Sequence, residues 1–329
     1  MSADKASDWD RYWAHGFLTS CADVFTGNYE GQMRALWERH FSRQPDGARI
    51  LDICTGNGAI ALIAAAIAQR QDKKFFIDAL DLAEIHPERA VDETHRSLLD
   101  GISFHPLTDA AETGLAEAGF DFISGHFALE YTDVPRTIAE LARLTAVGGE
   151  HLFLLHHNES VILKTAREEL EHFDLLFHHT AIFDHAEDLI KIVGSTLSSQ
   201  RSALAEQPAV EKLREALNDA AARLTNAQRK SNHPEMLRNA LGGIAESYKL
   251  AQKGQLEAGL QTLHESKAEI EANAARLGDL LSAASDKHDL GKFREDYLSR
   301  GFSDCTISTL EEEQIGLIGW ILHAQRNIA

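Results

Sequence analysis

The chain has 329 residues, enough for two domains or for one domain with a large insertion. It is 44% hydrophobic, and its 51 acidic and 32 basic residues give a formal net charge of -19. Such an acidic chain is a poor partner for phosphate backbones and anionic membranes, so nucleic acid is not an expected substrate. The polar N-terminus is not typical of a signal peptide, and no apolar run approaches the roughly 18 residues of a membrane span.

The cysteines and histidines carry no recognisable metal or disulfide pattern. Cys21, Cys54 and Cys305 show no paired spacing, so we expect reduced thiols and a cytoplasmic protein. The 17 histidines form no HExxH and no Cys/His motif. Because no set of oxygen ligands is visible either, the sequence predicts no metal.

Residues 8–41 are expected to be helical, with a turn over residues 25–31. Tyr12, Trp13 and Tyr29 allow two interpretations. They could form a lid that closes over a ligand and excludes water, or they could be ordinary core between a helix and a sheet. Tyr29, in its glycine-flanked turn, is the preferred lid residue.

The next part of the chain alternates between strand and helix patterns. The predicted strands cover residues 49–53, 75–82, 102–104, 120–124 and 150–156. An amphipathic helix is predicted over residues 134–144, and the glycine pair at 148–149 should end it. Strands separated by helical stretches favour a parallel sheet with helices on both faces.

From residue 158 the strand pattern disappears for about 130 residues. A heptad stripe, interrupted at Lys267, runs through Leu256, Leu260, Leu263, Ile270, Ala274, Leu277 and Leu281. It predicts antiparallel helices packed on one another; a homodimer or a protein partner bound through this block remains an alternative. Strand patterns return at 305–310 and 317–323, which could form a final hairpin. The expected domains are an N-terminal helical arm (1–47), an α/β core (48–157), an inserted helical subdomain (158–290) and a helix with strands completing the core (291–329).

The first predicted strand leads into a glycine turn. Residues 55–58 read Thr-Gly-Asn-Gly and precede an alanine-rich helix, a pattern that lets a backbone approach a ligand closely. Asp52, four residues before Gly56, suits a ligand with a cationic amino group and a sulfonium, and opposes a pyrophosphate at the helix N-terminus. Asp81, at the end of the second strand, can accept hydrogen bonds from ribose hydroxyls. NAD enzymes share such an acid, so Asp81 indicates a nucleoside; Asp52 and the predicted final hairpin favour S-adenosylmethionine (SAM) over NAD.

Four segments resemble class I SAM-dependent methyltransferases: RILDICTGNG, ALDL, FDFISGHFALEY and LARLTAVGGEHLFLL. The resemblance covers residues 45–157 and 295–325. It implies an α/β fold, with a Rossmann-like, seven-stranded, mostly parallel sheet that ends in an antiparallel hairpin and carries the helical block as an insertion. It also implies SAM as cofactor, S-adenosylhomocysteine as product, and an acid near the adenine at Asp109. The family's usual glycine two residues after the first acid is replaced here by Cys54.

The expected cofactor-binding residues follow from these motifs and from the N-terminal aromatics. They are Asp52, Thr55, Gly56, Asn57, Gly58, Asp81, Leu82, Asp109, Ala110, His126, Phe127, Tyr12, Trp13 and Tyr29.

Catalytic candidates cluster after the fourth and fifth strands. His126 is predicted to act as a general base or as a hydrogen-bonding group for the substrate, and Glu130 and His156 are further candidates. Each could instead be structural. The absence of Asp/Asn-Pro-Pro-Tyr/Phe and of Pro-Cys argues against methylation of adenine, cytosine or glutamine.

The predicted function is methyl transfer to an oxygen or nitrogen of a non-nucleic-acid acceptor, with a small molecule expected. Two alternatives stay open. One is an inactive methyltransferase-like scaffold that works through its helical insertion. The other is an NAD-dependent oxidoreductase, which Asp52 and the final hairpin disfavour.

Overall fold

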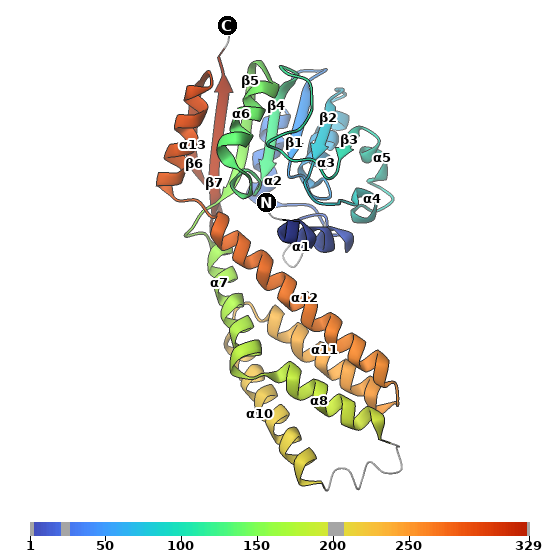
Figure 1. Cartoon of the computed structure of the whole chain (residues 1–329). Coiled ribbons are helices and arrows are strands. Elements are labelled where there is room, and N and C mark those ends of the chain that lie inside the picture. The colour runs from blue at the N-terminus through green and yellow to red at the C-terminus, as the bar shows by residue number, and fades with distance from the viewer. Residues whose placement is uncertain (1–2, 21–26, 197–206, 328–329) are drawn as a thin grey trace. The chain divides into compact units, whose positions relative to one another are not determined.

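The computed structural model describes residues 3–20, 27–196 and 207–327 (Figure 1). The chain divides into two compact units. The first, here called the α/β unit, comprises Met1–Leu163 and Asp279–Ala329. The second, the helical unit, is Lys164–Gly278. Cys21, and the start of the turn expected at residues 25–31, lie outside the described residues.

The α/β unit is built on one seven-stranded sheet with strand order β3-β2-β1-β4-β5-β7-β6. The first five strands pair in parallel, and β7 runs antiparallel to both β5 and β6. This order confirms the predicted Rossmann-like sheet with a C-terminal antiparallel hairpin. The strands are β1 (Arg49–Ile53), β2 (Phe76–Leu80), β3 (Ile102–His105), β4 (Phe120–His126), β5 (Thr145–His156), β6 (Phe302–Glu312) and β7 (Gly316–Arg326).

Helices cover both faces of this sheet (Figure 1). Helices α2 and α3 pack on one face, and α6 and α13 pack on the other. In α3, Ala61 and Ala64 are fully buried, because their small side chains let the helix lie close to the strands. The helices are α1 (Ala3–Ala14), α2 (Gly31–Phe41), α3 (Ala59–Arg70), α4 (Pro87–Ala90), α5 (Arg96–Leu99), the 3-10 turn η1 (Leu129–Tyr131), α6 (Val134–Leu144) and α13 (Lys287–Ser299).

The glycine pair after α6 does not form the predicted turn. Strand β5 begins at Thr145, directly after the helix, and runs through Gly148 and Gly149. Gly148 has φ +77°, and the pairing of β4 with β5 shifts register between Phe120 and Phe122. The glycines therefore belong to an irregularity inside a longer strand, where a positive φ is needed.

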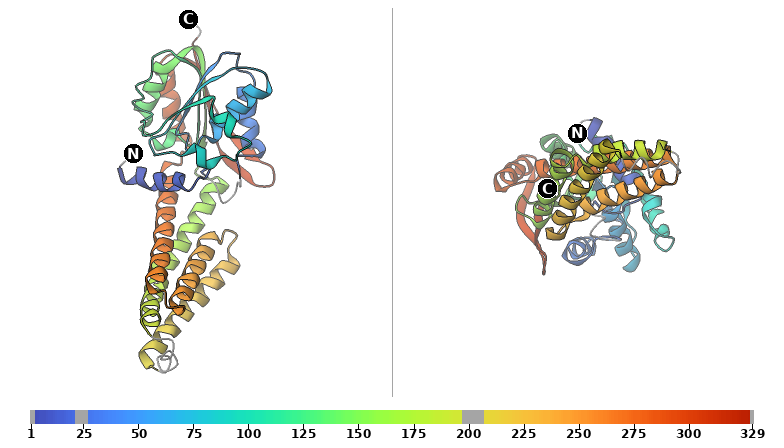
Figure 2. Two further views of the ribbon diagram at one scale, coloured as in Figure 1. Left: turned by 90° about the vertical axis from the view of Figure 1, so that its right-hand side faces the viewer. Right: turned by 90° about the horizontal axis from the view of Figure 1, so that it is seen from below.

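The described residues of the helical unit contain helices and no strand. Helices α8, α10, α11 and α12 run beside one another (Figure 2). The predicted stripe contributes Leu263 and Ile270 to their shared core. The interruption at Lys267 places an ammonium 5.8 Å from the centre of the Phe177 ring. The elements are α7 (Val161–Asp174), the π-helical turn η2 (Leu175–His179), α8 (Ile182–Ser195), α10 (Pro208–Lys230), α11 (Glu235–Gln252) and α12 (Leu256–Ala283); α7 and α12 cross the boundary with the α/β unit.

None of the described helices combines the length and the apolar character needed to cross a lipid bilayer.

Candidate active site

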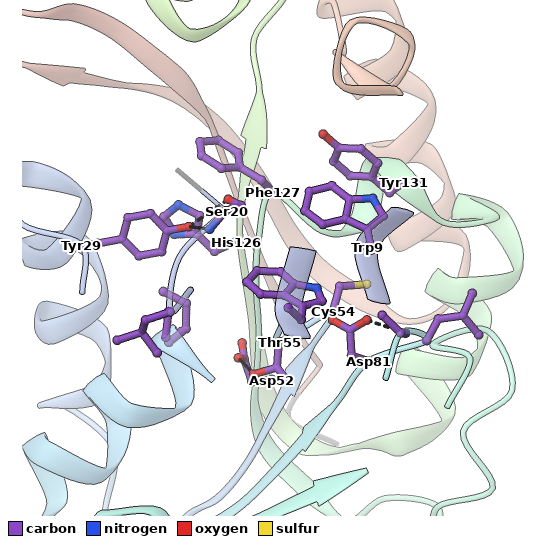
Figure 3. Close-up of a pocket in the computed structure, with 16 residues that line it drawn as sticks. Trp9, Ser20, Tyr29, Asp52, Cys54, Thr55, Asp81, His126, Phe127 and Tyr131 are labelled. Carbon is purple, nitrogen blue, oxygen red and sulfur yellow. Dashed lines mark hydrogen bonds between the residues drawn. The ribbon is translucent and has the colours of Figure 1, made fainter. Parts of the chain in front are cut away.

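A pocket opens at the carboxyl ends of β1, β2 and β4 (Figure 3). This is where open α/β sheets bind ligands, because the loops that follow the strands meet there. Its lining consists of Trp9, Trp13, Leu18, Ser20, Tyr29, Asp52, Cys54, Thr55, Ala59, Ile60, Asp81, Leu82, Ala83, His126, Phe127 and Tyr131.

Two buried carboxylates border this pocket. Asp52 accepts hydrogen bonds from Thr55 Oγ1 (2.6 Å) and Ser124 Oγ (2.7 Å). Burial nevertheless raises the pKa of Asp52 to about 7. Asp81 accepts the backbone N–H groups of Gly56 and Ala83, both at 2.8 Å, and burial raises its pKa to about 6. A cationic ligand would favour the ionised form of both acids.

The glycine turn approaches a tryptophan in this structure. Gly56 has φ +55°, and a Cβ added there would overlap the Trp13 ring. Gly58 has φ +91°, and its added Cβ would lie 2.9 Å from the Phe104 ring. Both glycines are therefore required by turn conformation and aromatic packing, and neither lines the pocket.

Asn57 fastens α1 to the glycine turn. Its Nδ2 donates to the backbone carbonyls of Trp13 (3.0 Å) and Phe17 (2.7 Å), and its Oδ1 accepts the His86 N–H (2.7 Å). The side chain is fully buried and does not line the pocket. In this structure Asn57 positions the segment that carries Trp13, and its contact with a ligand stays a prediction.

Two non-glycine residues of the pocket lining adopt a left-handed backbone. Cys54 has φ +48° and Phe127 has φ +53°. Such conformations cost roughly 1–3 kcal/mol each and concentrate at functional sites. Cys54 stands where the resembled family has glycine, and its positive φ gives the physical reason for that preference.

His126 is held as a neutral hydrogen-bond donor. Trp37 Nε1 donates to His126 Nδ1 at 2.9 Å, and an indole N–H can only donate. The ring stacks on Tyr29 with centroids 4.0 Å apart, and burial lowers its pKa well below the usual value. Because Nδ1 is an acceptor, the single proton of the neutral ring resides on Nε2. That nitrogen is buried without a protein partner. It can donate to a ligand, but it has no lone pair with which to act as a general base.

Glu130 and His156 lie behind the pocket wall and outside its lining. Glu130 Oε1 accepts the His156 backbone N–H at 2.8 Å, and burial raises the pKa of Glu130 to about 7. The His156 ring stacks on Phe127 with centroids 3.9 Å apart and 6° between the planes. Their contacts support the strained Phe127; a catalytic role for either residue stays a prediction.

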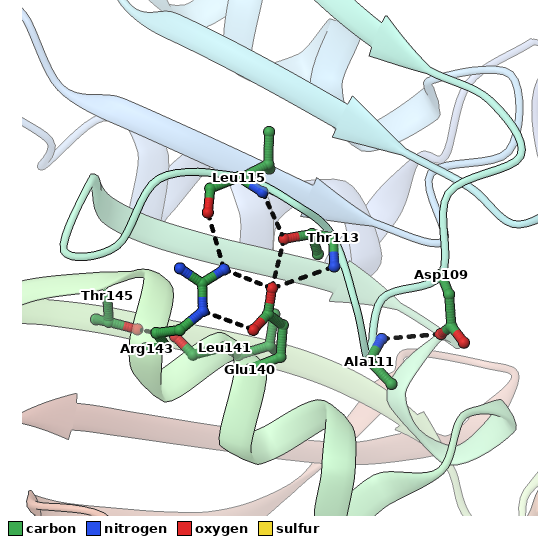
Figure 4. Close-up of polar contacts among 8 residues, drawn as sticks. All are labelled: Asp109, Ala111, Thr113, Leu115, Glu140, Leu141, Arg143 and Thr145. Atoms are coloured by element: carbon green, nitrogen blue, oxygen red, sulfur yellow. Dashed lines mark hydrogen bonds and ion pairs between the residues drawn. The ribbon is translucent and has the colours of Figure 1, made fainter.

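Three further predicted contacts also lie outside the lining. Tyr12 donates its hydroxyl to the Thr19 carbonyl (2.8 Å), Asp109 is exposed, and Ala110 is buried in the core. Asp109 and Ala110 lie on a loop that is joined to α6 by a hydrogen bond from the Thr113 hydroxyl to Glu140 (Figure 4). Glu140 also accepts from Arg143 on the same helix.

Eight predicted cofactor residues do line the pocket: Asp52, Thr55, Asp81, Leu82, His126, Phe127, Trp13 and Tyr29. The prediction missed the other eight: Trp9, Leu18, Ser20, Cys54, Ala59, Ile60, Ala83 and Tyr131. Cys54, Ala59, Ile60 and Ala83 lie within two residues of the glycine turn or of Asp81, so adjacency to these motifs could have identified them. Tyr131 ends the FDFISGHFALEY segment, whereas Trp9, Leu18 and Ser20 belong to no motif.

No protein-family model and no curated protein matches this sequence. Solved structures with a similar fold include a SAM-dependent methyltransferase from Mesorhizobium loti, 25% identical over 37% of this chain and 52% of its own, with a TM-score of 0.30. Phosphoethanolamine N-methyltransferase 2 from Haemonchus contortus is 12% identical, covering 98% and 57% of the two chains, with a TM-score of 0.40. Geranyl diphosphate C-methyltransferase from Streptomyces coelicolor is 12% identical, covering 47% and 65%, with a TM-score of 0.36.

These similar structures are all methyltransferases, and this chain spans between 52% and 65% of their lengths. The likeness concerns the fold. The strand order and the antiparallel hairpin independently give the sheet that the class I methyltransferase resemblance implies.

Proposed function

We propose that this protein is a SAM-dependent methyltransferase whose cofactor binds in the pocket at the ends of β1, β2 and β4. One observation carries the proposal: Asp52 and Asp81 are both buried beside the same pocket, at the ends of adjacent parallel strands. Burying a carboxylate costs stability, and the raised pKa values show that the hydrogen bonds to Asp52 and Asp81 do not fully offset that cost. A ligand with a ribose and two positive centres would give each acid a further partner.

The aromatic lining supports the same ligand. Trp9, Trp13, Tyr29, Phe127 and Tyr131 all line the pocket. Flat ring faces suit the stacking of an adenine, and their negative π faces attract a sulfonium or an ammonium. A pyrophosphate would gain nothing from these rings and would be repelled by both acids.

The proposed reaction moves the methyl group from the sulfonium to an oxygen or nitrogen of a small, non-nucleic-acid acceptor. Because the methyl carbon is already activated, holding the attacking atom in line with the breaking C–S bond does most of the work. His126 assists as a donor, since its Nε2–H can hold an acceptor atom of a ligand in the pocket. Proton loss from the acceptor therefore falls to water or to another group.

Calorimetric titration with S-adenosylhomocysteine tests cofactor binding. The wild type should bind, and Asp81→Asn should bind about 10- to 100-fold more weakly, the range expected for a lost charged hydrogen-bond partner. Asp78→Asn is the matched control, because Asp78 lies on β2, which Asp81 directly follows, pairs with His105 (2.7 Å) and does not line the pocket. No binding to a folded, ligand-free wild type would overturn the proposal. Equal affinities of the Asp81→Asn and Asp78→Asn variants for S-adenosylhomocysteine would also overturn it.

A further inference from the structure

A second, polar cavity of the α/β unit lies away from the proposed active site. Its lining is His40, Arg43, Gln44, Pro45, Asp121, Val147, Gly148, Gly149, Glu150 and His323. It shares no residue with the first pocket. Three of its side chains, those of His40, Glu150 and His323, each offer a ligand atom, and these atoms all lie within 4.8 Å of one another.

The sheet register explains how two of these residues meet. Leu152 on β5 is paired with His323 on antiparallel β7. Glu150 precedes Leu152 by two residues, so the two-residue period of a strand places Glu150 on the same face as His323. His323 Nε2 lies 3.3 Å from Glu150 Oε2.

Helix α2 supplies the third residue. It packs on this face of the sheet, where the Phe41 and Phe122 rings meet with centroids 5.3 Å apart. His40, the neighbour of Phe41, is thereby placed with its ring centroid 5.6 Å from that of His323. All three side chains are partly exposed, so the cavity is accessible to an ion from solvent.

We propose that His40, Glu150 and His323 form a binding site for a divalent first-row transition metal of the zinc type. Two imidazoles and one carboxylate are a ligand set that such ions prefer, with water in the remaining positions. The 3.3 Å between His323 and Glu150 matches the edge of about 3.4 Å that a tetrahedral zinc site requires. Magnesium and calcium demand six or more oxygen ligands, which this set does not offer.

The charges around the site are balanced apart from the ligands' own. The cavity lining holds the carboxylates of Asp121 and Glu150 beside the guanidinium of Arg43, and Arg39 also acts on His40. A bound ion would connect α2 to β5 and β7, and would therefore stabilise the folded α/β unit by mass action. The sequence predicted no metal because these ligands come from three distant segments that share no motif.

The test uses tag-free, EDTA-treated protein titrated with Zn²⁺ by calorimetry. The wild type should bind one Zn²⁺ at this site, whereas His40→Gln and His323→Gln should each weaken binding about 100-fold or more. His105→Gln is the matched control, because His105 also contacts a carboxylate, that of Asp78 at 2.7 Å, but belongs to no three-ligand group among the described residues. Zn²⁺ should raise the Tm of the wild type and the control only.

Substitution of Co²⁺ for Zn²⁺ adds a geometric readout, since its visible absorption separates tetrahedral from octahedral coordination. A low-coordinate spectrum that disappears in His40→Gln supports the site. The proposal is overturned if both histidine variants keep wild-type Zn²⁺ affinity, or if Mg²⁺ displaces Zn²⁺ at similar concentrations.

Discussion

The two units of this protein bury different kinds of side chain. In the α/β unit, acids and imidazoles are buried beside or behind one pocket: Asp52, Asp81, His126, Glu130 and His156. In the described part of the helical unit, the core is made of leucine, isoleucine, alanine, methionine and phenylalanine side chains. The buried polar side chains in that part are those of His172, Thr180, Ser247 and Arg276, none of them a carboxylate. The Thr180 and Ser247 hydroxyls donate to carbonyls four residues earlier in the chain.

This difference implies that folding stability and ligand binding depend on different sets of residues. A buried carboxylate whose pKa rises to about 7, as at Asp52, opposes folding at neutral pH because its ionised form has lost water. Apolar helix packing carries no such cost. We therefore expect loss of apolar side chains in the helical unit to lower stability without changing the pocket, and loss of a buried pocket carboxylate to weaken ligand binding without lowering stability at neutral pH.

The largest expected effect comes from Leu224→Ala in the helical unit. Leu224 is fully buried in the shared core of the helices, so the cavity should lower the free energy of unfolding by about 2–5 kcal/mol. Urea unfolding followed by circular dichroism measures this change. Leu298→Ala is the control, because Leu298 is 39% exposed and should cost far less. A loss of S-adenosylhomocysteine affinity in Leu224→Ala at full folding would break the proposed separation.

Much of the fold could be predicted because the relevant signals are local. Strand β1 and helix α6 have the predicted bounds, since an apolar run and an Asp133 N-cap followed by Pro135 mark them within a few residues. The start of β5 was wrong because a glycine pair is typical both of turns and of strand irregularities. Only the pairing with β4 distinguishes these two structures.

The site was predictable to the extent that it follows strand ends. Asp52 and Asp81 could be placed from their positions after apolar runs. The role of Asn57 could not, because its partners belong to a segment about 40 residues earlier, as the separations of 40 and 44 residues show. His126 was identified, but its protonation depends on Trp37, 89 residues away in the chain.

An intermediate effect is expected in the pH dependence of SAM binding. With a folded pKa of about 7, Asp52 is protonated in much of the free protein below neutrality, whereas a cationic ligand binds its ionised form. Affinity should therefore fall about tenfold per unit as the pH drops below 7, and more steeply below about 6, where Asp81 also gains a proton. Calorimetric titrations between pH 5.5 and 7.5 measure this.

Asp52→Asn serves as the test of that assignment. This variant should abolish the pH dependence of SAM affinity between pH 6 and 7 and leave only the dependence due to Asp81 at lower pH. The stability of the wild-type protein should change with pH in the opposite sense to its SAM affinity. Because folding raises the pKa of Asp52, protonation of this residue favours the folded state below about pH 4, and that contribution is lost as the pH rises through about 7. Wild-type affinity that stays constant from pH 5.5 to 7 would show that no pocket carboxylate faces the cation.

The smallest effect concerns a single proton on His126. The Trp37 hydrogen bond should keep Nδ1 bare and Nε2 protonated from pH 5.5 to 8, a preference of about 0.5–1.5 kcal/mol. Nitrogen-15 NMR of histidine-labelled protein reports both ring nitrogens, and the signal missing from His126→Asn identifies the residue. Trp37→Phe removes the indole donor and should let the second tautomer appear.

The tautomer decides the part His126 can play in methyl transfer. A ring fixed as an Nε2–H donor orients an oxygen or nitrogen lone pair, so its loss should weaken activity by a factor that does not vary with pH. A general base would instead produce a limb in the pH–rate profile near the imidazole pKa. Detection of a bare Nε2 at neutral pH would reverse this conclusion and restore His126 as the group that takes the acceptor's proton.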